Sequence, residues 1–469
     1  MSRKGKIDLV LYDLVIENVA AEGKAITHTP DGQVVFVEFA VPGDVVDVRI
    51  IRKKKAFMEG RIIALKKPSE DRLEPFCKHF GVCGGCKWQP LPYSFQLAAK
   101  QRQVYDQLTR IGHLKVPEFN PIIGSDKTRE YRNKLEFSAS CKRWILSDED
   151  PESLTPDQKV GLGFHVSNFF DKVLDIEQCH LQAEPSNAIR LFVKKYAVEH
   201  GIPFYDLREN TGVFRNMFVR TTEDGQVMLI FCFGCEFAGR KAMLDAVSEA
   251  FPQITSLYYV INTKCNDSIS DQECILYKGD EAIYERMEDL RFKIGPKSFY
   301  QTNNGQAYNL YKVARDFAAL TGNEVVYDLY TGTGTIAQFV SSRASKVIGI
   351  EYVPEAIEDA RVNAAGNNIT NCEFFAGDMK DVLTDGFIDE HGRPDVMIVD
   401  PPRAGMHPDV IKVILGAAPE RIVYVSCNPA SQARDIEMMS GKYKITAVQP
   451  VDMFPHTQHV ENVCLLELI

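Results

Sequence analysis

The sequence predicts a mixed α/β protein of three domains, and three observations support this. Short β-branched segments follow one another up to residue 68, cysteines concentrate at 75–90, and helical and β-branched segments alternate from residue 300 onward. A chain of 469 residues also exceeds the size that one hydrophobic core normally serves. We therefore expect a β-barrel at 1–68, a central α+β domain with a cysteine cluster at 69–295, and an α/β domain at 296–469.

Residues 1–68 are expected to form a small β-barrel. Gly, Pro and Asp turns separate four short segments that are rich in β-branched residues, namely DLVIENVA, QVVFVEFA, DVVDVRIIR and FMEGRIIAL. The turn TPDGQ at 29–33 carries an Asp-Gly pair, which favours a hairpin. Strands at this spacing predict a five-stranded barrel, an architecture that often binds nucleic acid. The basic run RKKK at 52–55 is either a phosphate contact or a solvated strand face.

The central region predicts an α+β domain without regular alternation. Helical patterns cover 94–112, which ends at Gly112, and 184–201, where Pro185 falls early and Gly201 ends the helix. The segments EYRNKLEFSAS and FRNMFVRTTEDGQVMLIFCF indicate sheet, the second with a hairpin at EDG. The acidic, Pro-containing stretch 146–159 is expected to be an exposed loop.

The C-terminal region predicts a parallel sheet with crossover helices. Its strand-like segments, among them NEVVYDL, KVIGIE, PDVMIVD and ERIVYVS, are separated by helical patterns. In such a doubly wound sheet, ligands bind at the carboxyl ends of the strands. We therefore expect the chemistry of the protein to lie at that edge.

One half of this edge has the features of a cofactor site. The segment VVYDLYTGTGTIA combines a strand, an acid and a glycine turn that leads into a helix, so Gly332 and Gly334 would let a ligand approach the backbone. Acidic residues end four strands, including Glu351, Asp378 and Asp400, and no Lys or Arg lies within 328–342. Acidic residues suit the sulfonium cation of S-adenosylmethionine better than they suit a phosphate cofactor. We therefore expect S-adenosylmethionine here, and a nucleotide is the alternative ligand. Glu351 is placed to accept hydrogen bonds from a ribose diol.

The other half of the edge predicts methyl transfer to a weakly nucleophilic carbon. Cys427 ends a strand, Asp400 begins the turn DPPR, and Glu461 lies in HVENV before the last apolar run. C5 of uracil becomes nucleophilic when a thiolate adds to C6, and a carboxylate must later remove the C5 proton. Amino-group methylation through DPPR, with an idle cysteine, is a second possibility, and a non-catalytic RNA-binding protein is a third.

Four cysteines predict a metal site. Cys77, Cys83 and Cys86 follow the spacing C-x5-C-x2-C, and Cys179 is a distant fourth. Four thiolates can hold zinc or an iron–sulfur cluster. Three clustered ligands plus one remote ligand favour the cluster over zinc, and buried cysteines without a ligand are the remaining alternative.

The motifs SCNPAS, DPPRAG, HVENV and SFYQTN together resemble those of the RNA uracil-5-methyltransferase family. Residues 1–68, with the turn VPGD, resemble a TRAM domain, an OB-like RNA-binding barrel found in many such enzymes. The resemblance implies a Rossmann-like class I methyltransferase domain and a [4Fe-4S] cluster on the cysteine pattern. Barrel and cluster together resemble the ribosomal branch, which favours 23S rRNA as the substrate; a transfer-RNA uridine is the alternative.

The resemblance also implies roles for individual residues. Cys427 corresponds to the nucleophile and Glu461 to the base, with Asp400 beside them. Thr331 and Thr335 stand where the family commonly has Cys and Asn. The cofactor would be contacted by Gln301, Tyr330, Thr335, Glu351, Asp378 and Asp400.

Bulk properties bear on the setting of the protein. The net charge of −10 argues against a protein that coats nucleic acid, though a local basic face remains compatible with it. The first residues, MSRKGKIDLV, lack the apolar core of a signal peptide, and no run approaches the length of a membrane span. We expect a cytoplasmic, monomeric protein with RNA as its partner and no membrane association.

Overall fold

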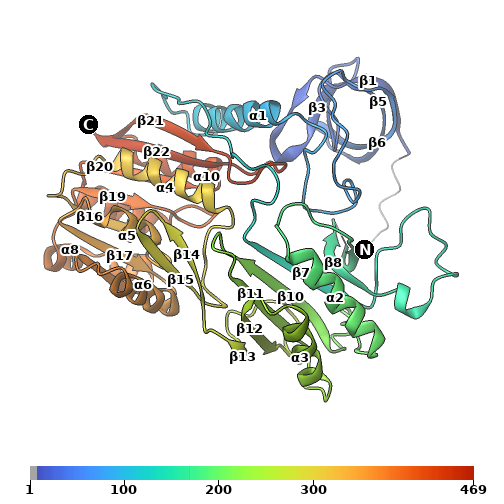
Figure 1. Cartoon of the computed structure of the whole chain (residues 1–469). Coiled ribbons are helices and arrows are strands. Elements are labelled where there is room, and N and C mark those ends of the chain that lie inside the picture. The colour runs from blue at the N-terminus through green and yellow to red at the C-terminus, as the bar shows by residue number, and fades with distance from the viewer. Residues whose placement is uncertain (1–7, 168) are drawn as a thin grey trace.

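The computed structural model describes residues 8–167 and 169–469 (Figure 1). The barrel (blue) and the central domain (green) lie together on one side of the molecule, and the C-terminal sheet (yellow to red) lies on the other. The start of the chain, residues 1–7, for which no signal peptide was expected, lies outside the described residues.

The N-terminal domain is a curled sheet of six strands, so the prediction of five was wrong. The predicted first strand divides into β1 and the two-residue β2, and the hairpin at 29–33 joins β3 to β4. The ends of the sheet approach each other where the Thr27 hydroxyl donates to the Val15 carbonyl at 2.6 Å. The strands are ordered β1-β5-β6-β4-β3-β2, with bounds β1 (Val10–Val15), β2 (Asn18–Val19), β3 (Ala25–His28), β4 (Val34–Val37), β5 (Val45–Lys53) and β6 (Phe57–Lys67); the short η1 (Ala21–Gly23) follows β2.

The central domain is built on a seven-stranded sheet, ordered β13-β12-β11-β10-β7-β8-β9. Only β11 and β12 pair in parallel, across the crossover helix α3, which agrees with the predicted lack of regular alternation. The predicted hairpin at EDG joins β10 to β11, and the predicted loop at 146–159 is mostly exposed and contains the short turn η3. The bounds are β7 (Lys134–Ser140), η3 (Pro156–Gln158), β8 (Gly161–Val166), β9 (Phe169–Asp175), α2 (Ser186–Glu199), β10 (Phe214–Thr221), β11 (Val227–Phe233), α3 (Arg240–Ala250), β12 (Ile254–Ile261) and β13 (Ile275–Gly279).

The C-terminal domain has a seven-stranded sheet ordered β18-β17-β16-β19-β20-β22-β21. Its first five strands are parallel, as predicted, whereas β22 runs antiparallel to both β20 and β21. The bounds are α4 (Asn304–Ala318), β16 (Val325–Leu329), α5 (Thr335–Ser341), β17 (Lys346–Glu351), α6 (Pro354–Gly366), β18 (Cys372–Ala376), α7 (Met379–Val382), α8 (Asp385–His391), β19 (Val396–Val399), α9 (Pro408–Ala417), β20 (Arg421–Ser426), α10 (Pro429–Met439), β21 (Tyr443–Val451) and β22 (Glu461–Leu468).

Helices cover both faces of this sheet. Alternate residues of each strand point to opposite faces, as the strand period of two requires. Val326 and Ile398 pack with α4, α5 and α6 on one face, whereas Tyr327 and Met397 pack with α8, α9 and α10 on the other. The small hairpin of β14 (Ile283–Met287) and β15 (Leu290–Ile294) joins the first of these cores.

A segment from the N-terminal half of the chain also packs on the C-terminal sheet. Helix α1 (Tyr93–Asp106) and the π-helical turn η2 (Gln107–Ile111) lie beside β21 (Figure 1) and bury Val104 and Leu108 in its core. Backbone bridges from Phe119 to Val448 and from Ile123 to Val451 continue this contact. Residues that precede the central sheet in the sequence are thus packed against the C-terminal sheet.

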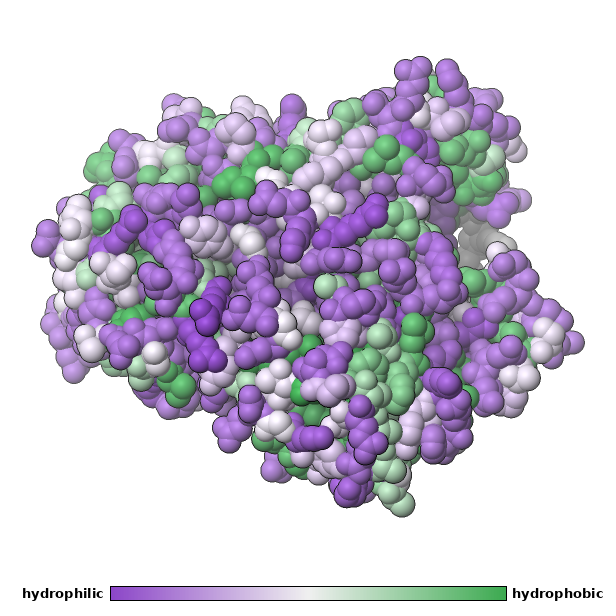
Figure 2. All heavy atoms as spheres, viewed as in Figure 1, coloured by the Kyte–Doolittle hydropathy of each residue, from purple (hydrophilic) through white to green (hydrophobic). Residues whose placement is uncertain are grey.

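The surface is mostly hydrophilic on the face drawn in Figure 2, with apolar side chains in scattered groups. Among the residues described, no helix combines the length and the apolar character that crossing a membrane requires.

Candidate active site

The parallel strands of the C-terminal sheet end at one rim. The register pairs β16 with β17 and β19, and β19 with β20, so their carboxyl ends lie side by side. Each predicted side chain at a strand end therefore reaches this rim. Glu351 ends β17, Asp378 follows β18, Asp400 follows β19 and Cys427 follows β20.

Antiparallel pairing brings Glu461 to the same rim. Ser426, the last residue of β20, is paired with Asn462 near the start of β22. One step further along both strands places Cys427 opposite Glu461, although 34 positions separate the two in sequence (461 − 427). The antiparallel direction of β22 was not predicted from the sequence. This strand is therefore the one that completes the site.

Burial and neighbouring carboxyl groups at this rim raise the pKa of Cys427 and of Glu461. Burial raises the pKa of Cys427 to about 11, with further increases from Glu461 and Asp400. Burial also raises the pKa of Glu461 to about 8, and the charge of Asp400 adds to this shift. Arg403 opposes the shift at both Cys427 and Glu461, so a cation lies near the two reactive groups.

The turn that carries Arg403 is held against the start of α10. The Asn428 side chain and the Ser431 hydroxyl both donate to the Arg403 carbonyl, at 2.9 and 3.0 Å. The Arg403 guanidinium lies 3.2 Å from Nδ1 of His459. The prolines of DPPR and these hydrogen bonds together keep the turn rigid beside Cys427.

At the other half of the rim the backbone leaves room for a ligand. A Cβ atom added at Gly332 would meet nothing within 4 Å, whereas one at Gly334 would lie 2.9 Å from Ala360 and Phe374. Gly334 is therefore required by packing, and Gly332 leaves open space above the turn. Glu351 accepts hydrogen bonds from the N–H groups of Gly332 and Val353, at 3.2 and 3.0 Å.

Two of the predicted cofactor residues, Tyr330 and Thr335, flank the glycine turn. Tyr330 has a left-handed backbone with φ of 66°, and its hydroxyl pKa is raised to about 12 by burial first, then by Asp435, Asp378 and Glu351. Thr335 begins α5, and its hydroxyl lies 3.3 Å from that of Thr333. The acids of the rim suit a cationic ligand, because a positive charge would relieve their mutual repulsion.

The family models that match this chain agree with the fold. A tRNA (uracil-5-)-methyltransferase model matches residues 280–469, and a TRAM domain model matches residues 11–63. An uncharacterized RNA methyltransferase of Porphyromonas gingivalis is 58% identical over 459 residues, covering 96% of this chain and 98% of its own. A second one, from Bacteroides thetaiotaomicron, is 59% identical over 454 residues, covering 96% and 100%. The chain belongs to the RNA uracil-5-methyltransferase family.

A solved structure extends the similarity over the whole molecule. The Pyrococcus abyssi tRNA (uracil-54, C5)-methyltransferase, in complex with S-adenosyl-L-homocysteine, is 29% identical with a TM-score of 0.73. The match covers 96% of this chain and 99% of that one. This protein is therefore an RNA (uracil-5-)-methyltransferase that uses S-adenosylmethionine, and the predicted fold class is confirmed. The alternatives of amino-group methylation and of a non-catalytic binding protein are excluded.

Two residues of the methyltransferase rim had no predicted role. Asp328 is fully buried at the end of β16, where burial raises its pKa to about 7 and the Thr331 hydroxyl and Ala337 N–H donate to it. Tyr311 is buried on α4; burial raises its pKa well above the usual value, and Asp400 and Asp328 add to the shift.

The two differ in what the sequence shows. Asp328 lies just before the glycine turn, a position that sequence reasoning can flag. Nothing in the sequence around Tyr311 distinguishes it from a core residue. Gln301 also acts on the pKa of Tyr311, in the opposite direction, so the predicted cofactor residue and this buried hydroxyl are neighbours.

The four predicted cysteine ligands of the methyltransferase lie near one another. Burial raises the pKa of Cys83 to about 11 and that of Cys86 to about 12, and Cys77 and Cys179 add to both shifts. All four are free thiols, and Cys83 forms a backbone bridge to Val166. Across residues 8–167 and 169–469, no group of three or more His, Cys, Asp or Glu is arranged to hold a single metal ion.

Proposed function

We propose that Cys427 is the nucleophile of the methyltransferase and Glu461 its base. The Cys427 sulfur adds to C6 of uracil, and the electrons of the C5–C6 double bond make C5 nucleophilic. C5 then takes the methyl group of S-adenosylmethionine, which leaves as S-adenosylhomocysteine. Glu461 removes the proton from C5, the double bond forms again, and the sulfur leaves C6.

The register of β20 against β22 carries this proposal. It sets the thiol and the carboxyl group on facing strands at one rim, where burial and neighbouring carboxyl groups raise the pKa of both. A base that must accept a proton from carbon benefits from a raised pKa, because its affinity for the proton is then higher. Glu461, with a pKa of about 8, has this property.

Asp400 and Arg403 would support the two reactive groups. Asp400 lies between the cofactor half and the reacting half, and burial together with Asp328 raises its pKa to about 7. It can accept a hydrogen bond from the uracil ring or position the methyl donor. Arg403 favours the thiolate form of Cys427 by its positive charge.

S-adenosylmethionine would supply the methyl group, and the residues around the open space at Gly332 would hold it. Glu351 would bind the ribose hydroxyls, and Asp378 would accept a hydrogen bond from the adenine amino group. Gln301, Tyr330, Thr335 and Asp400 would complete the contacts. The acids of the rim and the space above Gly332 fit a cofactor that is bulky and cationic.

We further propose that Cys77, Cys83, Cys86 and Cys179 hold a [4Fe-4S] cluster. The thiols of Cys83, Cys86 and Cys179 are half-buried, and burial and neighbouring thiols of the set raise the pKa of each. Bound iron would favour the thiolate forms. A four-iron cluster separates its ligands more widely than one ion does, so the lack of a ready single-ion site in the described residues is compatible with it. Iron and sulfide analysis of protein purified without oxygen should find both, and Cys179→Ser should lose them.

The substrate is a uridine in structured RNA, and we propose 23S rRNA as the first candidate. In the sequence, the barrel and the cysteine cluster together favoured 23S rRNA. However, the tRNA enzyme from Pyrococcus abyssi matches 96% of the present chain, so this architecture does not separate the two substrates. A transfer-RNA uridine is the second candidate. Mass-spectrometric mapping of 5-methyluridine in 23S rRNA and tRNA, from cells with and without the gene, distinguishes them.

We propose that the enzyme works as a monomer in the cytoplasm. We also propose domain limits of 1–68, 69–280 and 281–469. The second limit replaces the expected one at 295/296, because the hairpin of β14 and β15 packs with the C-terminal core and the methyltransferase family model begins at residue 280. Limited proteolysis should cut near these limits, and sedimentation should give the monomer mass.

The proposed chemistry is tested with RNA that carries 5-fluorouridine. Fluorine at C5 cannot leave as a proton, so the enzyme with S-adenosylmethionine should remain covalently bound to the RNA under denaturing electrophoresis. Cys427→Ala should abolish the slow band. The matched control is Cys372→Ala, because Cys372 begins β18 at the opposite edge of the sheet and its loss should leave the band intact. A band that persists in Cys427→Ala would refute the role of Cys427.

A further inference from the structure

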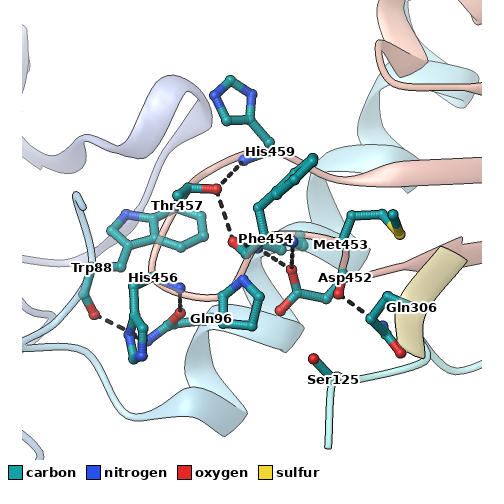
Figure 3. Close-up of polar contacts among 12 residues, drawn as sticks. Trp88, Gln96, Ser125, Gln306, Asp452, Met453, Phe454, His456, Thr457 and His459 are labelled. Atoms are coloured by element: carbon teal, nitrogen blue, oxygen red, sulfur yellow. Dashed lines mark hydrogen bonds and ion pairs between the residues drawn. The ribbon is translucent and has the colours of Figure 1, made fainter. Parts of the chain in front are cut away.

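The loop between β21 and β22, residues 452–460, is held by groups from other parts of the chain. Each of its carbonyl oxygens from 452 to 456 accepts a hydrogen bond from outside the loop. Figure 3 shows the contacts of Gln96 with His456 and of Gln306 with Asp452. The donors are Gln306 to Asp452 (2.8 Å), Asn303 to Met453 (3.0 Å), Lys100 to Phe454 (3.0 Å), Tyr131 to Pro455 (3.1 Å), and the N–H groups of Lys87 and Trp88 to His456 (2.8 and 3.1 Å).

A buried ion pair fastens the start of the loop to helix α1. Nζ of Lys100 lies 2.5 Å from the carboxylate of Asp452, and both side chains are fully buried. The Tyr93 hydroxyl donates to the second oxygen of Asp452 at 2.8 Å. Charged groups are expensive to bury without a partner, so this pair specifies where the loop begins.

A second contact from α1 holds the middle of the loop. The carbonyl oxygen of the Gln96 side chain accepts the His456 N–H at 2.8 Å, and its amide lies 3.2 Å from the His456 ring. His456 has a left-handed backbone with φ of 65°, a conformation that costs free energy in a residue other than glycine. The hydrogen bonds from Gln96 and from the 87–88 backbone offset this cost.

The loop leads directly into the proposed base. Val460 is buried and Glu461 begins β22, while His459 contacts Arg403 beside Cys427. In the part of the chain that the structure describes, no hydrogen bond to the Glu461 carboxylate is found. Its orientation therefore depends on the packing around it and on the backbone of the loop that runs directly into it.

We propose that Gln96, Lys100 and Tyr131 are positioning residues for Glu461, acting through the loop 452–460. The inference rests on the proposed role of Glu461 as the base. Helix α1 and the segment that follows the cysteines would thus control one step of the reaction, namely release of the methylated RNA. Formation of the bond between Cys427 and C6 would not depend on them.

The two steps can be measured separately. In release, Glu461 takes the proton from C5, the C5–H electrons form the C5–C6 double bond, and the C6–S bond breaks to return the Cys427 thiolate. Adduct formation precedes this proton transfer and is seen alone with 5-fluorouridine RNA. A displaced base therefore slows release and lets the methylated covalent adduct accumulate on natural uridine.

Tyr131→Phe is the most conservative test, because it removes only the hydroxyl that donates to the Pro455 carbonyl and keeps the buried ring. Tyr443→Phe is its matched control. Tyr443 is also a buried tyrosine that donates to a proline carbonyl, that of Pro419 at 2.8 Å, but it lies at the far end of β21. The substrates are unmodified 23S rRNA and tRNA transcripts, of which the one that the wild type methylates is used.

We expect Tyr131→Phe to slow release roughly tenfold, with adduct on natural uridine rising accordingly and the rate of 5-fluorouridine adduct formation within about twofold of wild type. Tyr443→Phe should match the wild type in both steps. Equal slowing of both steps by Tyr131→Phe, unchanged release, or the same effect in Tyr443→Phe would each overturn the proposal.

Gln96→Met provides a second variant of similar volume, which removes the contacts with His456. It should slow release more than Tyr131→Phe, again without slowing adduct formation. Failure of the proposed function would look different. In that case the wild type would form no adduct, or Glu461→Gln would accumulate none on natural uridine, whatever the α1 variants do.

Discussion

The two halves of the catalytic rim are assembled in different ways. The cofactor half comes mainly from one stretch of chain, residues 328–378, in which each strand end follows the last across a single helix. The reacting half combines residues 400–435 with Glu461 on an antiparallel strand, and residues 87–131 hold the loop before it. The cofactor half can come from one stretch of chain because it needs hydrogen-bond acceptors at fixed backbone positions. The reacting half must orient a base with respect to a nucleophile, and it therefore draws on distant stretches.

Glu461→Gln is expected to have the largest effect on the reacting half. Without the carboxylate the C5 proton has no acceptor, so turnover should fall by roughly 10²–10⁴-fold while methylated adduct accumulates on natural uridine. Quantifying labelled methyl groups on protein-bound and on free RNA measures both quantities. Free methylated RNA at the wild-type rate would contradict the assignment and leave the reacting half without a base.

Lys100→Met tests how much the distant support contributes to the reacting half. It leaves the carboxylate of Asp452 buried without its partner, which should lower the free energy of unfolding by about 3–5 kcal/mol. Urea denaturation measures the loss. Lys241→Met, which removes an exposed pair with Asp245 on α3, should change stability little. Similar losses in both variants would show that the buried pair is not special.

The rate of RNA release and the affinity for S-adenosylmethionine should depend differently on pH, because only release requires the Glu461 carboxylate. Its pKa of about 8 means that the carboxylate fraction rises about tenfold per pH unit below that value. Release of methylated RNA should therefore rise from pH 6 and level off above about 8, while binding of S-adenosylmethionine should not follow this curve. Single-turnover rates and calorimetric affinities across this range provide the measurement. Release that is flat with pH would contradict a raised pKa at the base.

The same shift has a consequence for stability. The folded protein holds the Glu461 proton up to about pH 8, whereas the unfolded chain releases it at the ordinary, lower pKa of glutamate. Unfolding therefore releases a proton in this window, and stability falls as the pH rises through it. As the pH rises from 5 to 9, the free energy of unfolding of Glu461→Gln should therefore fall less than that of the wild type.

The smallest effect is expected in the cofactor half. Glu351→Gln replaces one acceptor with a donor at the end of β17 and should weaken S-adenosylmethionine binding roughly tenfold, with adduct release unchanged once cofactor saturates. Glu355→Gln, in the exposed first turn of α6, serves as the control for loss of charge. Isothermal titration measures both, and unchanged affinity in Glu351→Gln would remove this residue from the cofactor site.

The sequence by itself indicated the candidate residues of the site and the expected order of the domains. Cys427, Asp400 and Glu351 each follow a recognisable strand, and a parallel sheet brings strand ends to one edge by its geometry alone. The glycine turn and the four cysteines were likewise visible, because their signals lie within short stretches. Six strands in place of five in the barrel show the limit of the method, since a two-residue strand such as β2 has no pattern of its own.

Only the tertiary structure decided how the reacting half is oriented. The antiparallel direction of β22 sets Glu461 opposite Cys427, and periodicity cannot reveal it, because a strand has the same alternation in either direction. The pair of Lys100 and Asp452 spans 352 positions, and a sequence pattern shows that a face is buried without naming what covers it. Tyr311 and Tyr131 were missed for the same reason: a tyrosine in an apolar pattern reads as core, and its hydroxyl acquires a partner only when distant segments pack together.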